Sequence, residues 1–169
     1  MSRAEVRANQ KGEAIAQGHL DRFYRSQGWE PDRSQACPQF DVLLRADASW
    51  HPVEEKCLRW AGAEEAFLVE VVQAVWETDW GWYHHTDCQR LFWVPCDSEW
   101  RPRCLFSVNW PRFKEWVPEM MEEHPHPGQQ WRWHECPDGY GYTLNVRIPW
   151  ERIPDGLYHY WRHVDDLPF

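Results

Sequence analysis

The sequence predicts an α/β (α+β) fold, a mixed β-sheet flanked by helices, and three observations support that prediction. The first is a stripe of apolar residues at helical spacing within the first 27 positions. The second is a pair of strand-like runs, FDVLLR and VEEKCLRW, joined by a short turn. The third is the mixture of helix and strand patterns that follows, closing with a hairpin. With 169 residues, 43% of them hydrophobic, the chain is most simply one domain, 1–169.

The predicted first helix covers residues 2 to about 27. Ala16, Leu20, Phe23 and Tyr24 recur at helical spacing and form its apolar stripe, and Gly28 follows as a helix-ending residue. Glu13 lies seven residues before Leu20 and therefore falls on the same stripe. Such a carboxylate either reaches solvent or points at a polar site beneath the helix, and the sequence leaves both interpretations open.

A β-hairpin is predicted next, with strands at 40–45 and 53–60 and turn-forming residues at 46–49. If the turn centres near Ala48 and Ser49, Asp41 lies opposite Glu55 or Lys56. Glu54 and Lys56 are two residues apart and share one face of their strand. The hairpin is thus expected to bring two acids and a lysine to one patch.

The other elements follow from periodicity and from Pro and Gly breaks. Before and after the hairpin, the predictions are a short strand within 29–36, a helix at 63–76, a loop at 77–89, and strands at 90–94 and 103–108. They continue with a helix that starts near 109–111 and is kinked or shortened at Pro118, and with a hairpin of 131–136 with 142–150. The aromatic C-terminal run either covers an edge of the sheet or packs on it.

The composition limits the classes of function. The net charge of −9 opposes general binding to nucleic acid, which depends on lysine and arginine, so any contact with DNA would need a local basic patch in the N-terminal third. The chain has no apolar run of 18 residues and starts without a signal-peptide pattern, so we expect a cytoplasmic protein that does not enter a membrane. Six scattered cysteines are then expected to be free thiols.

Asp41, Glu54 and Lys56 suit metal-dependent phosphodiester chemistry. Carboxylates are the ligands that Mg²⁺ prefers, and the metal would activate a water and offset charge on the phosphate. A neighbouring lysine can orient that water or stabilise the transition state. Because the chain carries 27 acids, an acid two positions before a lysine is weak evidence by itself.

The order of elements around these residues resembles the PD-(D/E)XK nuclease superfamily. That family's core is a helix, a three-stranded meander, a second helix and a further strand, and residues 10–95 match it, with 96–169 as an elaboration. The resemblance implies that Asp41 and Glu54 bind Mg²⁺ or Mn²⁺ and that Lys56 positions the attacking water. It also implies that Glu13, the acid of the first helix, is an auxiliary catalytic acid and a further metal ligand. It also implies DNA as the substrate and a homodimer. Glu55 stands where the family usually has an apolar residue.

Other interpretations stay open beside this one. The three residues could form only hairpin salt bridges, or the chain could be an acidic interaction protein (a nucleic-acid mimic or an inhibitor) or an inactive nuclease fold used for binding. Two further groups are candidate zinc ligands, weighed against histidines and cysteines scattered in loops. They are His124, His126, His134 and Cys136, and a looser set of His84, His85, Cys88, Cys96 and Cys104. Tryptophans such as Trp80 and Trp82 could stack on bases, although packing is the favoured role.

Overall fold

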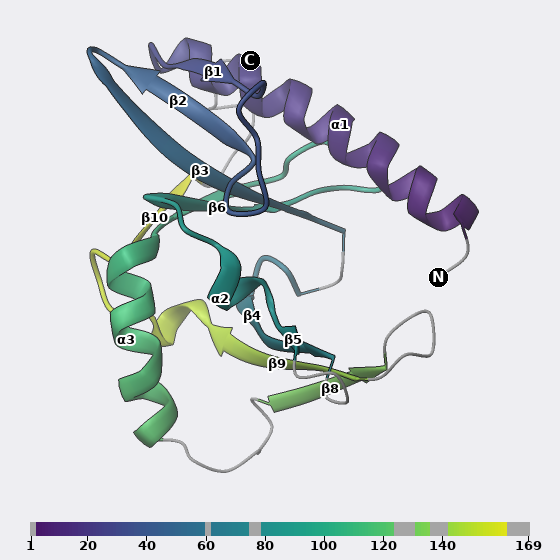
Figure 1. Ribbon diagram of the computed structural model, residues 1–169, viewed down its shortest axis with the longest axis vertical. Coiled ribbons are helices and arrows are strands. Elements are labelled where there is room, and N and C mark those ends of the chain that lie inside the picture. The colour runs from purple at the N-terminus through teal and green to yellow at the C-terminus, as the bar shows by residue number, and fades with distance from the viewer. Residues whose placement is uncertain (1–2, 60–61, 75–78, 124–130, 136–141, 162–169) are drawn as a thin grey trace.

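The computed structural model describes residues 3–59, 62–74, 79–123, 131–135 and 142–161, and they form an α+β fold with two β-sheets (Figure 1). The larger sheet has the strand order β1-β2-β3-β6-β7-β10. Neighbours in it are antiparallel except β3 and β6, which run parallel. Its strands are β1 (Glu30–Asp32), β2 (Val42–Ala46), β3 (Ser49–Leu58), β6 (Arg90–Pro95), β7 (Leu105–Asn109) and β10 (Tyr158–Trp161).

The smaller sheet has four antiparallel strands in the order β5-β4-β9-β8. Its strands are β4 (Ala66–Ala74), β5 (Asp79–Trp80), β8 (Trp131–Glu135) and β9 (Tyr142–Pro149). The helices of the described residues are α1 (Arg3–Ser26), α2 (Trp82–His85), α3 (Trp110–Glu123) and a 3₁₀ turn, η1 (Trp150–Arg152).

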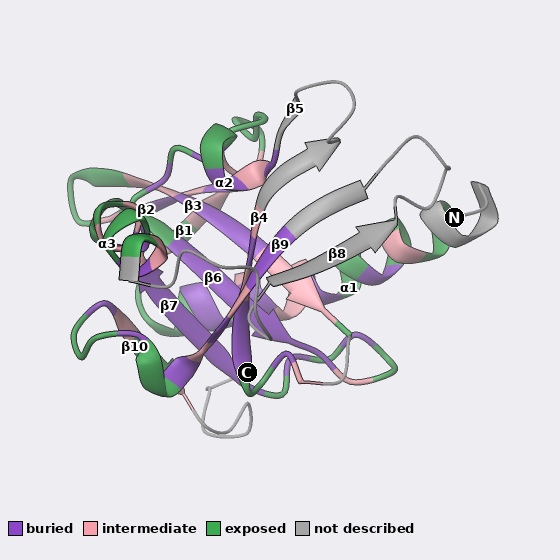
Figure 2. Cartoon of the chain, turned by 90° about the horizontal axis from the view of Figure 1, so that it is seen from below, coloured by how far each residue is buried: buried purple, intermediate pink, exposed green. Residues whose placement is uncertain are grey.

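The larger sheet is packed on both faces. Figure 1 shows α1 on one side of it, with α3 and the smaller sheet on the other. Each side has its own hydrophobic core: Leu20 and Phe23 of α1 pack with Phe92 in the first, and Phe67 of β4 packs with Phe113 of α3 in the second. The central strands are accordingly buried in Figure 2. The hairpin β2–β3 belongs to this sheet, which lies between the layer of α1 and the layer of α3 and the smaller sheet.

The helix predicted at 63–76 is wrong, because this segment forms strand β4. It pairs with β9 along its length, placing Phe67 opposite Ile148 and Val69 opposite Val146. Phe67 and Val69 are both buried, and a short apolar run of this kind carries no periodicity that separates strand from helix. The β-branched residues Val69, Val71 and Val72 were the available strand signal. The loop predicted at 77–89 likewise contains β5 and the short helix α2.

Most of the other predicted elements are confirmed. The strands at 90–94 and 103–108 correspond to β6 and β7, the hairpin of 131–136 with 142–150 to β8 and β9, and the aromatic end to β10, which pairs with β7. Helix α3 continues through Pro118 to Glu123 and is not ended by it. Helix α1 ends as predicted: Gly28 has φ 77°, and the N–H of Trp29 donates to the carbonyl of Tyr24 at 2.9 Å.

Two glycines inside α1 provide a test of how this helix packs. A Cβ on Gly12 would lie 2.0 Å from the indole of buried Trp100, whereas a Cβ on Gly18 would meet nothing within 4 Å. Gly18→Ala should therefore stabilise the protein by about 1 kcal/mol through helix propensity. Gly12→Ala should instead destabilise it by about 1–3 kcal/mol, because the indole has to move. Urea unfolding of both variants checks this; equal stabilisation by both would show that α1 does not pack on Trp100.

Candidate functional site

The predicted hairpin forms, but its turn is centred one residue earlier in the chain than expected. The ladder pairs Ala46 with Ser49 and Val42 with Val53, so the turn centres on Asp47 and Ala48. Asp47 adopts a φ of 53°, a left-handed conformation that aspartate tolerates better than most residues. Asp41 consequently comes level with Glu54, and the expectation that it lies opposite Glu55 or Lys56 is wrong.

The shifted register fixes the Asp41 carboxylate at the start of β2. Its Oδ2 accepts the backbone N–H of Glu55 at 2.8 Å, and its own N–H donates to the carbonyl of Val53 at 2.9 Å. The negative charge of Asp41 also lies close enough to Glu54 to add to the rise of the Glu54 pKa, which burial causes in the main. The structure therefore brings together the two acids predicted to bind a metal.

Glu54 and Lys56 share a face of β3 as predicted, and they form an ion pair. The Glu54 side chain is only 9% exposed and that of Lys56 is 25% exposed, so the pair is largely removed from water. The Lys56 ammonium also lies 5.1 Å from the centre of the Trp82 ring, which makes a cation–π contact. Lys56 is thus held by a carboxylate and by an indole.

Glu13 joins this group from helix α1. It lines a cleft of about 260 Å³ together with Asp41 and Lys56. The residue is exposed overall, but burial of the carboxyl in the cleft raises its pKa; the charge of Asp41 raises it further and that of Lys56 opposes the rise. Of the two interpretations of Glu13, the structure supports a polar site beneath the helix.

Glu55 is charged at a position where the nuclease family usually has an apolar residue, and the structure shows how this charge is accommodated. Its side chain is 1% exposed and points toward α1, on the opposite face of β3 from Glu54. Arg33 binds it in a bidentate pair, with N–O distances of 2.9 and 3.0 Å, and the Tyr24 hydroxyl donates to it at 2.7 Å. Arg33 also pairs with Asp21 of α1 at 2.7 Å. Glu55 therefore occupies the core-facing position as an apolar residue would, because its charge is matched there.

Sequence analysis missed a further acid, Glu70, because it lies on the strand β4 that was predicted to be a helix. Burial raises the pKa of the Glu70 carboxyl, a backbone hydrogen bond from Trp82 opposes the rise, and so does the nearby charge of Lys56. Glu70 Oε1 accepts that N–H of Trp82 at 3.4 Å. A Cβ on the preceding Gly81 would lie 2.3 Å from the carbonyl of Glu70, so only glycine allows this approach.

The predicted metal ligands are Asp41, Glu54 and Glu13. Among the described residues, no three His, Cys, Asp or Glu side chains are arranged to hold a metal ion. The group therefore offers two adjoining carboxylates, Asp41 and Glu54. Mg²⁺ is commonly bound by one or two carboxylates with the remaining positions filled by water or phosphate, so this pair fits Mg²⁺ or Mn²⁺ and does not fit an all-protein cage.

The zinc predictions have different outcomes. His124, His126 and Cys136 lie outside the described residues, as does the side chain of His134. In the second group, Cys88, Cys96 and Cys104 are buried as free thiols, while His84 and His85 are exposed on α2. All five are described residues, and they form no group arranged to hold a metal ion. The aromatic residues of α2 pack rather than form an open surface: Tyr83 is buried and Trp82 stacks on Trp110.

The crowding of charge at this site makes stability depend on pH. Burial raises the pKa of Glu54 from 4.5 to about 7, with Lys56 opposing and Asp41 adding to the rise. Between these two values the folded protein retains a proton that the unfolded chain has released, so stability falls as pH rises through this window. The full loss, reached above pH 7, is about 3 kcal/mol.

Glu54→Gln should remove this dependence, since the amide mimics the protonated acid. The variant should match wild type near pH 5 and exceed its free energy of unfolding by about 3 kcal/mol near pH 8. Urea unfolding across this pH range measures it, with Glu119→Gln on the exposed face of α3 as the control. A constant difference between wild type and Glu54→Gln at all pH values would show that Glu54 does not titrate in this window.

The fold and site together define an α+β protein with a carboxylate–lysine cluster on a central hairpin. Searches of family models, of curated proteins and of solved structures give no match to this chain. Within the described part of the chain, no helix combines the length and apolar character needed to cross a membrane. The interpretation of the site consequently depends on its geometry.

Proposed function

We propose that this protein is a metal-dependent nuclease that hydrolyses phosphodiester bonds of DNA at the Asp41, Glu54 and Lys56 cluster. The observation that carries the proposal is that the hairpin register brings the Asp41 and Glu54 carboxyl groups to one level, beside a lysine that is ion-paired to Glu54. Two adjoining carboxylates repel each other, and a divalent cation bound by both would offset that repulsion.

Asp41 and Glu54 are the residues that would hold Mg²⁺ or Mn²⁺. When bound, the ion supplies an activated water and offsets negative charge on the phosphate. Because the pKa of Glu54 is about 7, proton and metal compete for this carboxylate near neutral pH. Metal-dependent activity should therefore rise between about pH 6 and 8.

Lys56 and Glu13 act from the two sides of this pair. Lys56 is restrained by Glu54 and Trp82, so its ammonium can orient a water or stabilise charge on the phosphate without a large loss of side-chain freedom. Glu13 lines the same cleft as Lys56 from α1. It would be an auxiliary acid that either positions a water or is itself a further metal ligand. The order of α1, the meander β1–β3 and the parallel strand β6 supports the proposal, although β4 and α2 take the place of the second helix.

The test is digestion of plasmid, single-stranded DNA and RNA with Mg²⁺ or Mn²⁺ and without either ion. Wild type should cut DNA only when the metal is present, and Asp41→Asn should lose this activity while its far-UV circular dichroism stays unchanged. Absence of cleavage of any substrate under any metal condition would overturn the proposal. Sedimentation of the same sample would test the homodimer.

An acidic interaction protein is the second candidate, and the net charge of −9 favours it. The pairing of Arg33 favours it too. This basic residue of the N-terminal third forms ion pairs with Asp21 and Glu55, so its guanidinium is not available to a phosphate. A nucleic-acid mimic would bind a DNA-binding enzyme without metal and without cleaving DNA. An inactive nuclease fold would bind Mg²⁺ at Asp41 and Glu54 yet cut nothing, so metal titration separates these two cases.

A further inference from the structure

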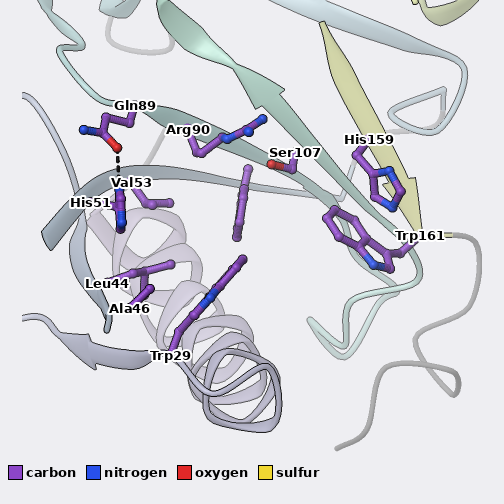
Figure 3. A pocket seen from close by; sticks show the side chains of 11 residues that line it. Trp29, Leu44, Ala46, His51, Val53, Gln89, Arg90, Ser107, His159 and Trp161 are labelled. Atoms are coloured by element: carbon purple, nitrogen blue, oxygen red, sulfur yellow. Dashed lines mark hydrogen bonds between the residues drawn. The ribbon is translucent and has the colours of Figure 1, made fainter. Parts of the chain in front are cut away.

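A cavity of about 460 Å³ opens on the α1 face of the larger sheet, beyond the C-terminal end of that helix (Figure 3). Its volume is in the range of small-molecule sites. Glu54 and Lys56 project from the opposite face of β3, so this cavity is separate from the carboxylate–lysine cluster.

The register of three strands, β6, β7 and β10, places side chains of the cavity on one face. Phe92 of β6 pairs with Ser107 of β7, which in turn pairs with His159 of β10. Directly paired residues share a face, so these three side chains form a row across the sheet. Arg90, two residues before Phe92, is on the same face and is a diagonal neighbour of Ser107.

Indole rings border this row at two sides. Figure 3 shows Trp29, from the segment after α1, and Trp161, from β10, both lining the cavity. Each is fixed by a ring of α1, with centroid distances of 6.3 Å from Tyr24 to Trp29 and 5.9 Å from Phe23 to Trp161. The two indoles and Phe92 offer a preformed apolar space to a flat ring.

Two polar side chains of the cavity, Ser107 and Arg90, have no hydrogen-bond or ion-pair partner among the described residues. Ser107 is 5% exposed, and its hydroxyl makes no hydrogen bond with any residue in the described ranges. Arg90 is exposed and forms no ion pair within those same ranges. Both donors are therefore available to an anion that enters the cavity.

The charge of the cavity is opposite to that of the whole chain. Among the residues that the structure describes, no aspartate or glutamate lines it, although the chain carries 27 acids and a net charge of −9. Its titratable lining residues are Arg90, His51 and His159, and His51 Nδ1 is hydrogen-bonded to Gln89 Oε1 at 2.5 Å. A ligand with an oxyanion is therefore favoured over a cation.

We propose that this cavity binds a small aromatic anion. The aromatic ring lies between Trp29 and Trp161 over Phe92, and the oxyanion accepts hydrogen bonds from Arg90 and Ser107. The oxyanion can be a carboxylate or a phosphate, as in an aromatic acid or a nucleoside monophosphate. This proposal does not depend on the nuclease assignment.

Isothermal titration calorimetry with 1-naphthoate and with adenosine 5′-monophosphate tests the proposal and separates the two sources of the anion. At least one of them should bind with a Kd below 1 mM. Naphthalene-1-methanol, adenosine and ribose 5-phosphate, which lack either the anion or the aromatic ring, should bind at least tenfold more weakly. If neither aromatic anion binds below 1 mM, or if the neutral analogues bind equally well, the proposal is wrong.

Variants locate the binding. Arg90→Gln should weaken binding of the better ligand about tenfold or more, since a charge-assisted hydrogen bond is lost. Ser107→Ala should weaken it severalfold, and Arg112→Gln, an exposed arginine on α3, should leave it unchanged. Lys56→Ala should also bind as wild type does, which keeps this result separate from the nuclease test. Unaltered affinity in Arg90→Gln would show that the ligand binds elsewhere.

Discussion

Replacing Arg33 with alanine should lower the free energy of unfolding by about 3–5 kcal/mol, which is a large part of the stability of an ordinary domain. The reason is Glu55, whose side chain is 1% exposed and whose main cationic partner is the Arg33 guanidinium. Without that partner a buried carboxylate is left with only the Tyr24 hydroxyl and nearby backbone. Urea unfolding near pH 8 measures the loss.

The sign of the pH dependence adds a second check. Burial raises the pKa of Glu55, and the hydrogen bonds from Arg33 oppose this rise. Removing Arg33 raises the Glu55 pKa further, so Glu55 takes up a proton and becomes neutral at a higher pH than in wild type. The destabilisation in Arg33→Ala should accordingly be smaller at pH 5 than at pH 8.

Two further variants separate this buried pair from ordinary salt bridges. Arg45→Ala removes an ion pair with Glu30 whose side chains are 49% and 62% exposed, and it should cost less than about 1 kcal/mol. The double variant Arg33→Met with Glu55→Leu removes both charges and should regain most of the stability. If Arg33→Ala costs no more than Arg45→Ala, the network does not hold α1 to the hairpin.

Replacing Lys56 with alanine should reduce the proposed DNA cleavage by at least about a hundredfold, the typical effect of removing one preorganised electrostatic group from an active site. Lys56 is the only lysine between residues 12 and 113, and its ammonium lies in the same cleft as Asp41 and Glu13. Single-turnover cleavage of a labelled duplex with Mg²⁺ measures the change. Lys11→Ala, which removes an exposed lysine of α1, is the matched control and should cut as wild type does.

The stability of the Lys56→Ala variant has to be measured beside its activity. Loss of the ammonium leaves Glu54 buried without its ion pair, so the variant should unfold at lower urea concentration near pH 8. Assays are therefore performed where circular dichroism shows the variant folded. Cleavage equal to that of wild type under those conditions would contradict the role given to Lys56.

The local elements were predictable where local rules decide them. The apolar stripe of α1, the stop at Gly28, the alternating hairpin strands and the late hairpin β8–β9 all depend on contacts between near neighbours in sequence, and all are present. The same rules placed Glu54 and Lys56 on one face of a strand, because side chains two apart along a strand point the same way. The separation of strand from helix at 66–74 required a partner strand more than 70 residues away.

The sequence alone determined which residues meet at the hairpin, and the tertiary structure decided how they meet. The one-residue shift of the turn, set by the backbone of Asp47, brings Asp41 level with Glu54, where its charge adds to the rise of the Glu54 pKa. Burial between two layers then raises the pKa of Glu54. On the other face of β3, the fold places Arg33 beside the buried Glu55, and the two charges offset each other. Glu70 and Trp82 reach Lys56 only because β4 forms. Desolvation and long-range pairing depend on the packed molecule, and no pattern of neighbouring residues contains them.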